Sequence, residues 1–133
     1  MGKKELFKNK FFNIFLNWLL VFPVDREVTD IGAVKKALRV LKAEKVLGIF
    51  PEGTRVYEFN PKNAKAGVAL LALKSNSPVI PVYIKSSYKL FSKVYIYIGK
   101  PINYKNIYPG KLDMDQYNII SQDILAKIYA LGG

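Results

Sequence analysis

The first 22 residues carry apolar side chains that recur at helical spacing. Phe7, Phe11, Phe15, Trp18 and Phe22 lie three or four positions apart, as residues on one face of an α-helix do. The polar residues form a narrow stripe made up of Lys3, Lys10, Asn13 and Asn17. This pattern predicts an amphipathic helix over residues 6–22. It fits a helix packed on a protein core, and it fits a helix half sunk in a membrane interface with its lysines near anionic headgroups.

A spanning helix or a signal peptide is not expected here. Asn13 and Asn17 interrupt the apolar run, and Pro23 ends it before the ~20 apolar residues that a bilayer requires. No small-x-small cleavage site follows the run, and the charged residues of the segment 25–27 come at once.

After residue 22, strand-like and helix-like periodicities alternate. Strands are predicted over residues 20–24, 46–50, 79–84 and 94–98. Helices are predicted from a cap at Asp30 to about Ala43, over 64–74, and after a capping box formed by Asp113 and Gln116. The helix that follows Asp30 is expected to bury Ile31, Val34, Leu38 and Leu41, and the last helix carries Ile120, Ile124, Ile128 and Leu131 along one line.

This alternation predicts an α/β fold with a mostly parallel mixed sheet flanked by helices. The length of 133 residues suits a single domain. Within it we expect residues 1–22 to form the interface helix and residues 23–133 to form the α/β core. Pro81 lies inside a predicted strand and indicates a sheet edge or an irregularity, because proline has no backbone donor.

The net charge of the chain limits the kinds of partner that we expect it to bind. The formal net charge is +11, which favours an anionic partner such as a membrane surface, a phosphorylated substrate or nucleic acid. Nucleic acid is not expected, because the aromatic residues lie in apolar strands and in the first helix, and no recognised nucleic-acid motif is present. There is no cysteine and no histidine, which excludes disulfides, thiol nucleophiles, histidine metal sites and a histidine base within these residues.

The segment Phe50-Pro51-Glu52-Gly53-Thr54-Arg55 is the strongest candidate for a site. It follows a predicted buried strand and opens into a polar stretch. Gly53 allows the backbone to approach a ligand closely, and Arg55 offers a planar fork of donors that suits a phosphate. The same residues also fit a plain tight turn, and the segment alone leaves both interpretations open.

Three segments together resemble motifs of a known family. They are Phe22-Pro23-Val24-Asp25-Arg26-Glu27, the Phe50–Arg55 segment, and Val79-Ile80-Pro81-Val82-Tyr83-Ile84. In this order and spacing they resemble the glycerolipid acyltransferases, and within them the 1-acylglycerol-3-phosphate (lysophosphatidate) acyltransferases of the bacterial PlsC type. The resemblance extends to about Ile102.

The resemblance implies acyl transfer from acyl-CoA or acyl carrier protein to lysophosphatidate, giving phosphatidate, with no cofactor and no metal. It implies that Arg55 holds the substrate phosphate, with Glu52, Gly53 and Thr54 shaping the loop. Arg26 is implied as a second phosphate ligand, and Lys65 as a further one. We expect the guanidinium groups of Arg26 and Arg55 to point into one cleft, with Glu52 orienting Arg55. The alternatives are a surface ion pair for Arg26 and a solvated charge for Lys65.

One departure from the family concerns catalysis. The family's first motif is a histidine followed after four residues by an aspartate, and this sequence has no histidine, so no catalytic residue is assigned. Val56 also stands where the family commonly has serine. The chain therefore resembles a family member that begins after its catalytic motif, with the N-terminal part missing. The alternative is a non-catalytic protein that binds lipid phosphates at a membrane surface. In both cases we expect peripheral association with anionic lipids on the cytoplasmic face of the membrane.

Overall fold

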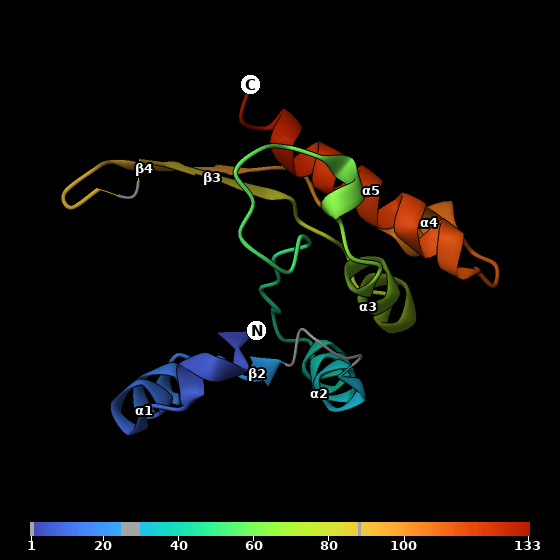
Figure 1. Ribbon diagram of the computed structural model, residues 1–133. Helices are drawn as coiled ribbons and strands as arrows, with labels where there is room; N and C mark the ends of the chain where they lie inside the picture. The colour runs from blue at the N-terminus through green and yellow to red at the C-terminus, as the bar shows by residue number, and fades with distance from the viewer. Residues whose placement is uncertain (1, 25–29, 88) are drawn as a thin grey trace. The chain divides into compact units, whose positions relative to one another are not determined.

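The computed structural model describes residues 2–24, 30–87 and 89–133, which form two compact units (Figure 1). The first unit is Met1–Ile49 and the second is Phe50–Gly133. The prediction of a single domain, with its division after residue 22, stays a prediction. Among the described residues, no helix combines the length and the apolar character that crossing a bilayer requires.

The first unit contains two short strands and two helices. Strand β1 (Gly2–Lys3) pairs in parallel with β2 (Pro23–Val24), and a 3₁₀ turn (Lys4–Phe7) leads from β1 towards helix α1 (Lys10–Trp18). The prediction of one continuous helix over residues 6–22 is therefore wrong in its bounds.

Local capping explains why that helix is shorter than predicted. The side chain of Asn9 accepts a hydrogen bond from the backbone N–H of Phe11 at 3.0 Å, which starts a new helix at Lys10. Leu20 takes a φ of +57°, a left-handed conformation that ends the helical run. None of the residues of α1 is buried, and Trp18 is 77% exposed.

Helix α2 (Ile31–Lys42) completes the first unit and agrees with its predicted bounds. The carboxylate of Asp30 accepts a hydrogen bond from the Ala33 backbone N–H at 2.8 Å, as expected of an N-cap. The predicted buried face is only partly correct, because Ile31 is exposed and the fully buried residues are Ala33 and Ala37.

The second unit contains the larger core. Helix α3 (Gly67–Ser75) packs on helix α5 (Met114–Ala130), and the short helix α4 (Tyr104–Ile107) contacts α3. Buried residues of α3 and α5 make up most of this core: Val68, Ala69, Leu71, Ala72, Leu73, Ile120, Ile124 and Leu125. Ser121 is fully buried between the two helices, and its hydroxyl accepts a hydrogen bond from the Ala69 backbone N–H at 3.4 Å. That bond satisfies a donor in the first turn of α3, where helices lack internal acceptors.

One of the predicted local signals is confirmed in this unit, and one is confirmed with a later start. The capping box at the start of α5 is present, with bonds of 2.8 Å and 3.0 Å exchanged between Asp113 and Gln116. The predicted helix over 64–74 begins later, at Gly67, because residues Pro61–Asn63 form a separate 3₁₀ turn.

Strands β3 (Val82–Ser86) and β4 (Val94–Ile98) form an antiparallel hairpin. In the described ranges the sheets are therefore the short parallel pair β1–β2 and this hairpin, and not the mostly parallel sheet that the sequence predicts. The strand predicted over 79–84 is shifted, since Pro81 cannot donate to a ladder and Val79 makes only an isolated bridge to Ile102. The strand predicted over 94–98 is confirmed.

The strand predicted over residues 46–50 is wrong, because these residues adopt no regular structure. Val46 is 97% exposed, and no strand of the described ranges pairs with this run. An apolar run of this kind becomes a strand only when neighbouring strands satisfy its backbone groups on both sides.

Candidate functional site

The Phe50–Arg55 segment forms a tight turn at the start of the second unit. The backbone N–H of Gly53 donates to the carbonyl oxygen of Phe50 at 3.1 Å. Gly53 has a φ of +68°, a left-handed conformation that glycine adopts without the steric cost that a Cβ would bring. The turn interpretation of this segment is therefore correct for residues 50–53, and its glycine is required by the backbone.

Lys65, in the segment before α3, is hydrogen-bonded to this turn through its backbone. Its backbone N–H donates to the carbonyl oxygen of the buried Pro51 at 2.8 Å. Its Cγ lies 3.4 Å from the point where a Cβ on Gly53 would stand. The structure thus brings two predicted site residues, Gly53 and Lys65, into contact, while the Lys65 side chain remains exposed.

Glu52 is held by a residue that the sequence did not point to. The phenol of Tyr129, in the last turn of α5, donates a hydrogen bond of 2.9 Å to Oε1 of Glu52. Burial, followed by the hydrogen bond to the Glu52 carboxylate, raises the pKa of Tyr129 from 10.0 to about 12. We expect Glu52 to orient Arg55, but within the described ranges its carboxylate accepts a hydrogen bond from Tyr129 instead. No local pattern reports a contact between positions 77 residues apart.

Aromatic rings surround the Tyr129 phenol. The ring centroid of Phe59 lies 4.6 Å from that of Tyr129, and the Tyr83 ring meets Tyr129 edge-on at 5.7 Å. Phe59 follows the motif segment, Tyr83 belongs to β3 and Tyr129 to α5. The end of α5 therefore joins the motif loop to the β3–β4 hairpin.

Thr54 and Arg55 follow the hydrogen-bonded turn of residues 50–53, and both are exposed. In the portions of the chain that the structure describes, the Arg55 guanidinium has no hydrogen bond and no ion pair. A guanidinium with open donors directly after a hydrogen-bonded turn is suited to an anion. Arg26 lies outside the described residues, so its meeting with Arg55 stays a prediction.

An open depression of about 540 Å³ adjoins the motif loop. Its lining combines aromatic rings, amide groups and one carboxylate from the residues Val56, Tyr57, Glu58, Phe59, Asn60, Pro61 and Asn63. The Asn60 side chain accepts a hydrogen bond from the Lys62 backbone N–H at 3.0 Å, which fixes the turn along one side of the depression.

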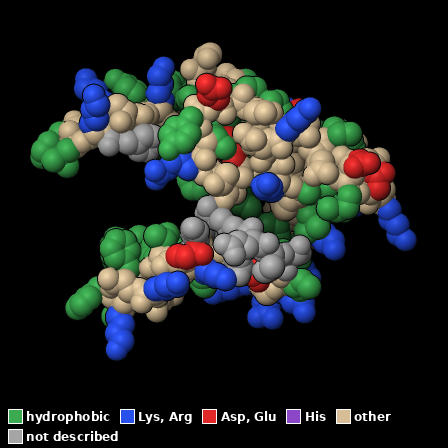
Figure 2. Space-filling view, viewed as in Figure 1, with side chains coloured by type: hydrophobic (Ala, Val, Ile, Leu, Met, Phe, Trp, Pro, Cys, Tyr) green, Lys and Arg blue, Asp and Glu red, His purple; other side chains and the backbone are tan. Residues whose placement is uncertain are grey.

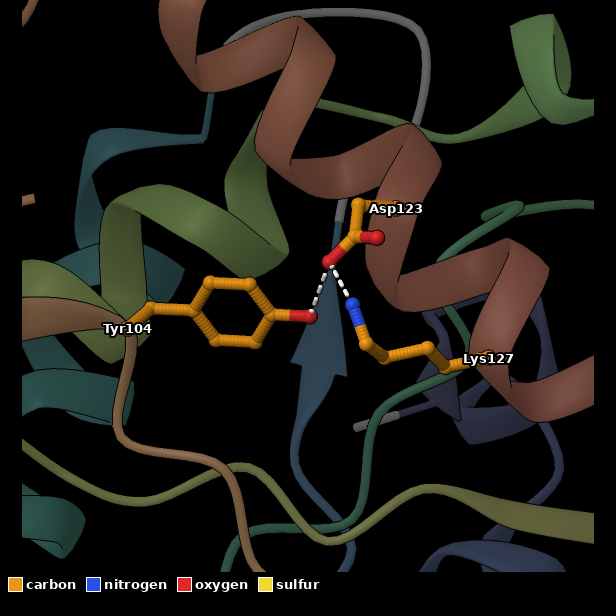
Figure 3. A network of polar contacts seen from close by, with 3 residues as sticks. All are labelled: Tyr104, Asp123 and Lys127. Carbon is orange, nitrogen blue, oxygen red and sulfur yellow. Dashed lines mark hydrogen bonds and ion pairs between the residues drawn. The ribbon is translucent and has the colours of Figure 1, made fainter. Parts of the chain in front are cut away.

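A second polar network lies on the same helix α5 and serves the fold (Figure 3). Tyr104 donates a 2.6 Å hydrogen bond to Oδ2 of Asp123, and the Lys127 ammonium binds the same oxygen. Burial raises the pKa of Tyr104, and the bond to Asp123 raises it further. Burial alone would raise the pKa of Asp123, but hydrogen bonds from Lys127 and Tyr104 outweigh it and lower that pKa below 3.8. The network ties α4 to α5.

The arrangement offers an exposed guanidinium beside a hydrogen-bonded turn, and donors of this kind suit an anion. Both tyrosines with raised pKa values are protonated at neutral pH and act as donors, so neither serves as a base. Metal-ligating side chains do not gather in groups of three or more anywhere in the described ranges.

Comparisons with known proteins identify the family. A family model described as Acyltransferase matches residues 1–85, which is more than half of the chain. A 1-acyl-sn-glycerol-3-phosphate acyltransferase of Bacillus subtilis (strain 168) is 37% identical over 77% of this chain and 53% of its own length. The protein of the same name from Borreliella burgdorferi is 29% identical over 96% of this chain and 55% of its own. The chain thus spans about half the length of these curated relatives.

A solved structure supports the fold. The crystal structure of the 1-acyl-sn-glycerophosphate acyltransferase PlsC from Thermotoga maritima matches 97% of this chain and 56% of its own, at 24% identity and a TM-score of 0.60. This likeness confirms the predicted α/β fold. The family match confirms the resemblance seen in the three sequence segments.

Proposed function

Because the chain belongs to the acyltransferase family, we propose that it forms the acceptor-binding part of an acyltransferase of phospholipid biosynthesis. The acceptor is 1-acylglycerol-3-phosphate, the compound named for its relatives, and the acyl donor is acyl-CoA or acyl carrier protein. In the reaction the acceptor hydroxyl oxygen forms an ester bond to the acyl carbon and the thioester C–S bond breaks. The hydroxyl proton passes to a base and the donor leaves as a thiol, giving phosphatidate.

The observation that carries this proposal is the position of an exposed guanidinium, that of Arg55, directly after a hydrogen-bonded turn. Glu52 is tied to Tyr129, the Pro51 carbonyl is tied to Lys65, and Arg55 follows immediately with its side chain exposed and, in the described ranges, unpaired. Because these bonds already hold the backbone just before Arg55, little of that backbone has to be ordered when the phosphate binds. We assign Arg55 as the principal phosphate ligand, Lys65 as a supporting cation and Arg26 as a second ligand. Thr54 and Gly53 shape the loop.

The base that takes the hydroxyl proton is not a histidine of these 133 residues, because the sequence contains none. We therefore propose that this chain by itself binds the acceptor without turning it over. The absence of histidine also favours a second candidate function, a non-catalytic protein that binds lipid phosphates at a membrane surface.

Helix α1 supports peripheral association with a membrane, and we propose its cytoplasmic face as the place. It buries none of its residues, and Phe11, Ile14 and Trp18 are exposed along it. An apolar helix surface next to lysines fits the interface of an anionic bilayer.

A chimera separates the two candidate functions. In it, this chain replaces the matching half of the Bacillus subtilis relative, and the remainder of that relative supplies the missing part. Labelled acyl-CoA and lysophosphatidate are the substrates. Transfer by the folded chimera, lost on Arg55→Ala, supports the acyltransferase. Lysophosphatidate binding by a folded chimera that transfers nothing supports the non-catalytic protein.

A further inference from the structure

We propose that the turn at the tip of the β3–β4 hairpin is a second membrane contact of this chain. In it, Leu90 and Phe91 enter the interfacial region of the bilayer, and Lys85, Lys89 and Lys93 meet anionic lipid headgroups. The proposal goes beyond the proposed function, because it does not depend on α1, on the phosphate site or on acyl transfer.

The hairpin projects these residues away from the helices of the second unit (Figure 1). The last paired positions of its two strands are Ser86 and Val94. Beyond them the chain closes in a tight turn, in which the Ser92 backbone N–H donates to the carbonyl oxygen of Lys89 at 3.0 Å. Leu90 and Phe91 are the two central residues of that turn, and they are 87% and 97% exposed.

The backbone at the tip is unusual for an aromatic residue. Phe91 has a φ of +61° at the third position of the turn, where glycine or asparagine is the normal choice. A bulky residue in this conformation is an outlier that costs stability. Phe91 is 97% exposed and, within the described ranges, its ring makes no aromatic pair, so packing of the ring offsets little of that cost. A strained residue that presents an apolar ring to solvent points to a role outside the fold.

The charge around the tip selects an anionic lipid surface. The sequence has no acidic residue from position 59 to position 112 and nine lysines over the same stretch. Three of these, Lys85, Lys89 and Lys93, are exposed on the hairpin and its turn. Figure 2 shows basic and hydrophobic side chains together at the outer end of the hairpin. An apolar tip flanked by lysines matches the layering of a bilayer interface, with anionic headgroups above acyl chains.

Two other occupants fit the tip less well, one because of its charge and one because of its side chains. A second copy of the chain meeting tip to tip would place lysines against lysines, which is repulsive. Nucleic acid binding uses aromatic platforms interleaved with basic side chains. Here one of the two exposed apolar residues at the centre of the turn is the aliphatic Leu90, which has no ring to stack on a base. Both occupants are outcomes of the experiment below.

The test measures binding of the full chain to vesicles of phosphatidylcholine, alone and mixed with phosphatidylglycerol. Phe91→Gly is the informative variant, because glycine is better suited to a φ of +61° and the melting temperature should stay equal or rise. Vesicle binding should nevertheless weaken about tenfold, since the ring no longer enters the interface.

The double variant Lys89→Gln with Lys93→Gln tests the charge. It should weaken binding to the anionic vesicles about fivefold or more and leave phosphatidylcholine binding unchanged. Ile119→Ala, which trims an exposed aliphatic residue of α5, is the control and should change neither.

A fluorescence experiment isolates the tip from α1. The chain has one tryptophan, Trp18, so Phe91→Trp in a Trp18→Phe background reports the tip alone. Brominated lipids should quench this tryptophan, most strongly when the bromines lie near the headgroups. No quenching, or unchanged vesicle binding by Phe91→Gly, overturns the proposal. If Phe91→Gly changes the mass of the particle in solution but leaves vesicle binding unchanged, the proposal is overturned in favour of self-association. The full chain could also bind an oligonucleotide in a salt-sensitive way. If Phe91→Gly abolishes that binding while vesicle binding persists, the proposal is overturned in favour of nucleic acid.

Discussion

The phenol of Tyr129 in the last turn of α5 donates a 2.9 Å hydrogen bond to the carboxylate of Glu52, 77 residues earlier in the chain. This bond joins the C-terminal helix to the loop that presents Arg55. It explains how a loop of the acyltransferase motif is kept in shape by a part of the chain that the motif does not include.

Removal of this bond should loosen the loop. Tyr129→Phe keeps the ring that packs on Phe59 but leaves Glu52 without its donor. We expect the free energy of unfolding in urea to fall by about 1–2 kcal/mol, as for a partly exposed hydrogen bond to a carboxylate. Tyr95→Phe is the control, because its hydroxyl lies on the exposed β4 strand. Equal losses in the two variants would show that the Glu52 bond stabilises nothing.

The same residue predicts a pH dependence. The folded-state pKa of Tyr129 is raised from 10.0 to about 12, so its protonated form adds stability that is fully present below pH 10. That stability should be lost as the pH rises through about 12, where the folded protein also loses the phenol proton. Unfolding free energies measured at pH values on both sides of 10 should therefore decline less steeply for Tyr129→Phe than for the wild type. Parallel curves would mean that the phenol titrates alike in the folded and unfolded chain.

The glycine of the motif loop is expected to be required by its backbone. Gly53→Ala forces a Cβ into a φ of +68°, and we expect a loss of about 1–2 kcal/mol in unfolding free energy. Space is not the cause, because the nearest atom to such a Cβ is Lys65 Cγ at 3.4 Å, an ordinary contact. Gly110→Ala is the matched control, since nothing lies within 4 Å of its Cβ position and its φ is not positive. A Gly53→Ala variant as stable as the control would remove the conformational argument for this loop.

Helix α1 should bind lipid surfaces. The double change Phe11→Ser with Trp18→Ser removes two exposed rings, and binding to phosphatidylglycerol vesicles in a sedimentation assay should fall at least about tenfold. Added salt should weaken the wild-type binding, because part of it is attraction between lysines and headgroups. Ile31→Ser, on the exposed part of α2, serves as the control. Wild-type binding by the double variant would assign α1 to a protein contact instead.

Local signals were readable in the sequence. Asp30 starts α2 and the Asp113–Gln116 box starts α5, because each cap depends on side chains within three residues of the backbone group that it satisfies. The turn at Gly53 is one of the two interpretations that the sequence leaves open, and the three segments together predict the family that the comparisons show.

Long-range features were not readable. Residues 46–50 have the composition of a buried strand, but a strand also requires partners, and the described ranges pair none with it. Tyr129 looked like any other aromatic residue of α5, since its role depends on a loop 77 residues away. Asn9 and Leu20, which shorten α1, compete with an apolar periodicity that continues through both of them.

The most direct test of the account is calorimetric titration of the purified chain with lysophosphatidate below its micellar concentration. Arg55→Ala should weaken binding about tenfold or more, because a guanidinium–phosphate bond of this kind contributes roughly 1.5–3 kcal/mol. Arg55→Lys should restore it only in part, since lysine lacks the planar fork. Arg39→Ala, which removes an exposed arginine from α2, should bind like the wild type, and monoacylglycerol without a phosphate should bind poorly to all four proteins. Equal lysophosphatidate affinity in the wild type, Arg55→Ala and Arg55→Lys would contradict the assignment and leave the Phe50–Arg55 segment as a structural turn.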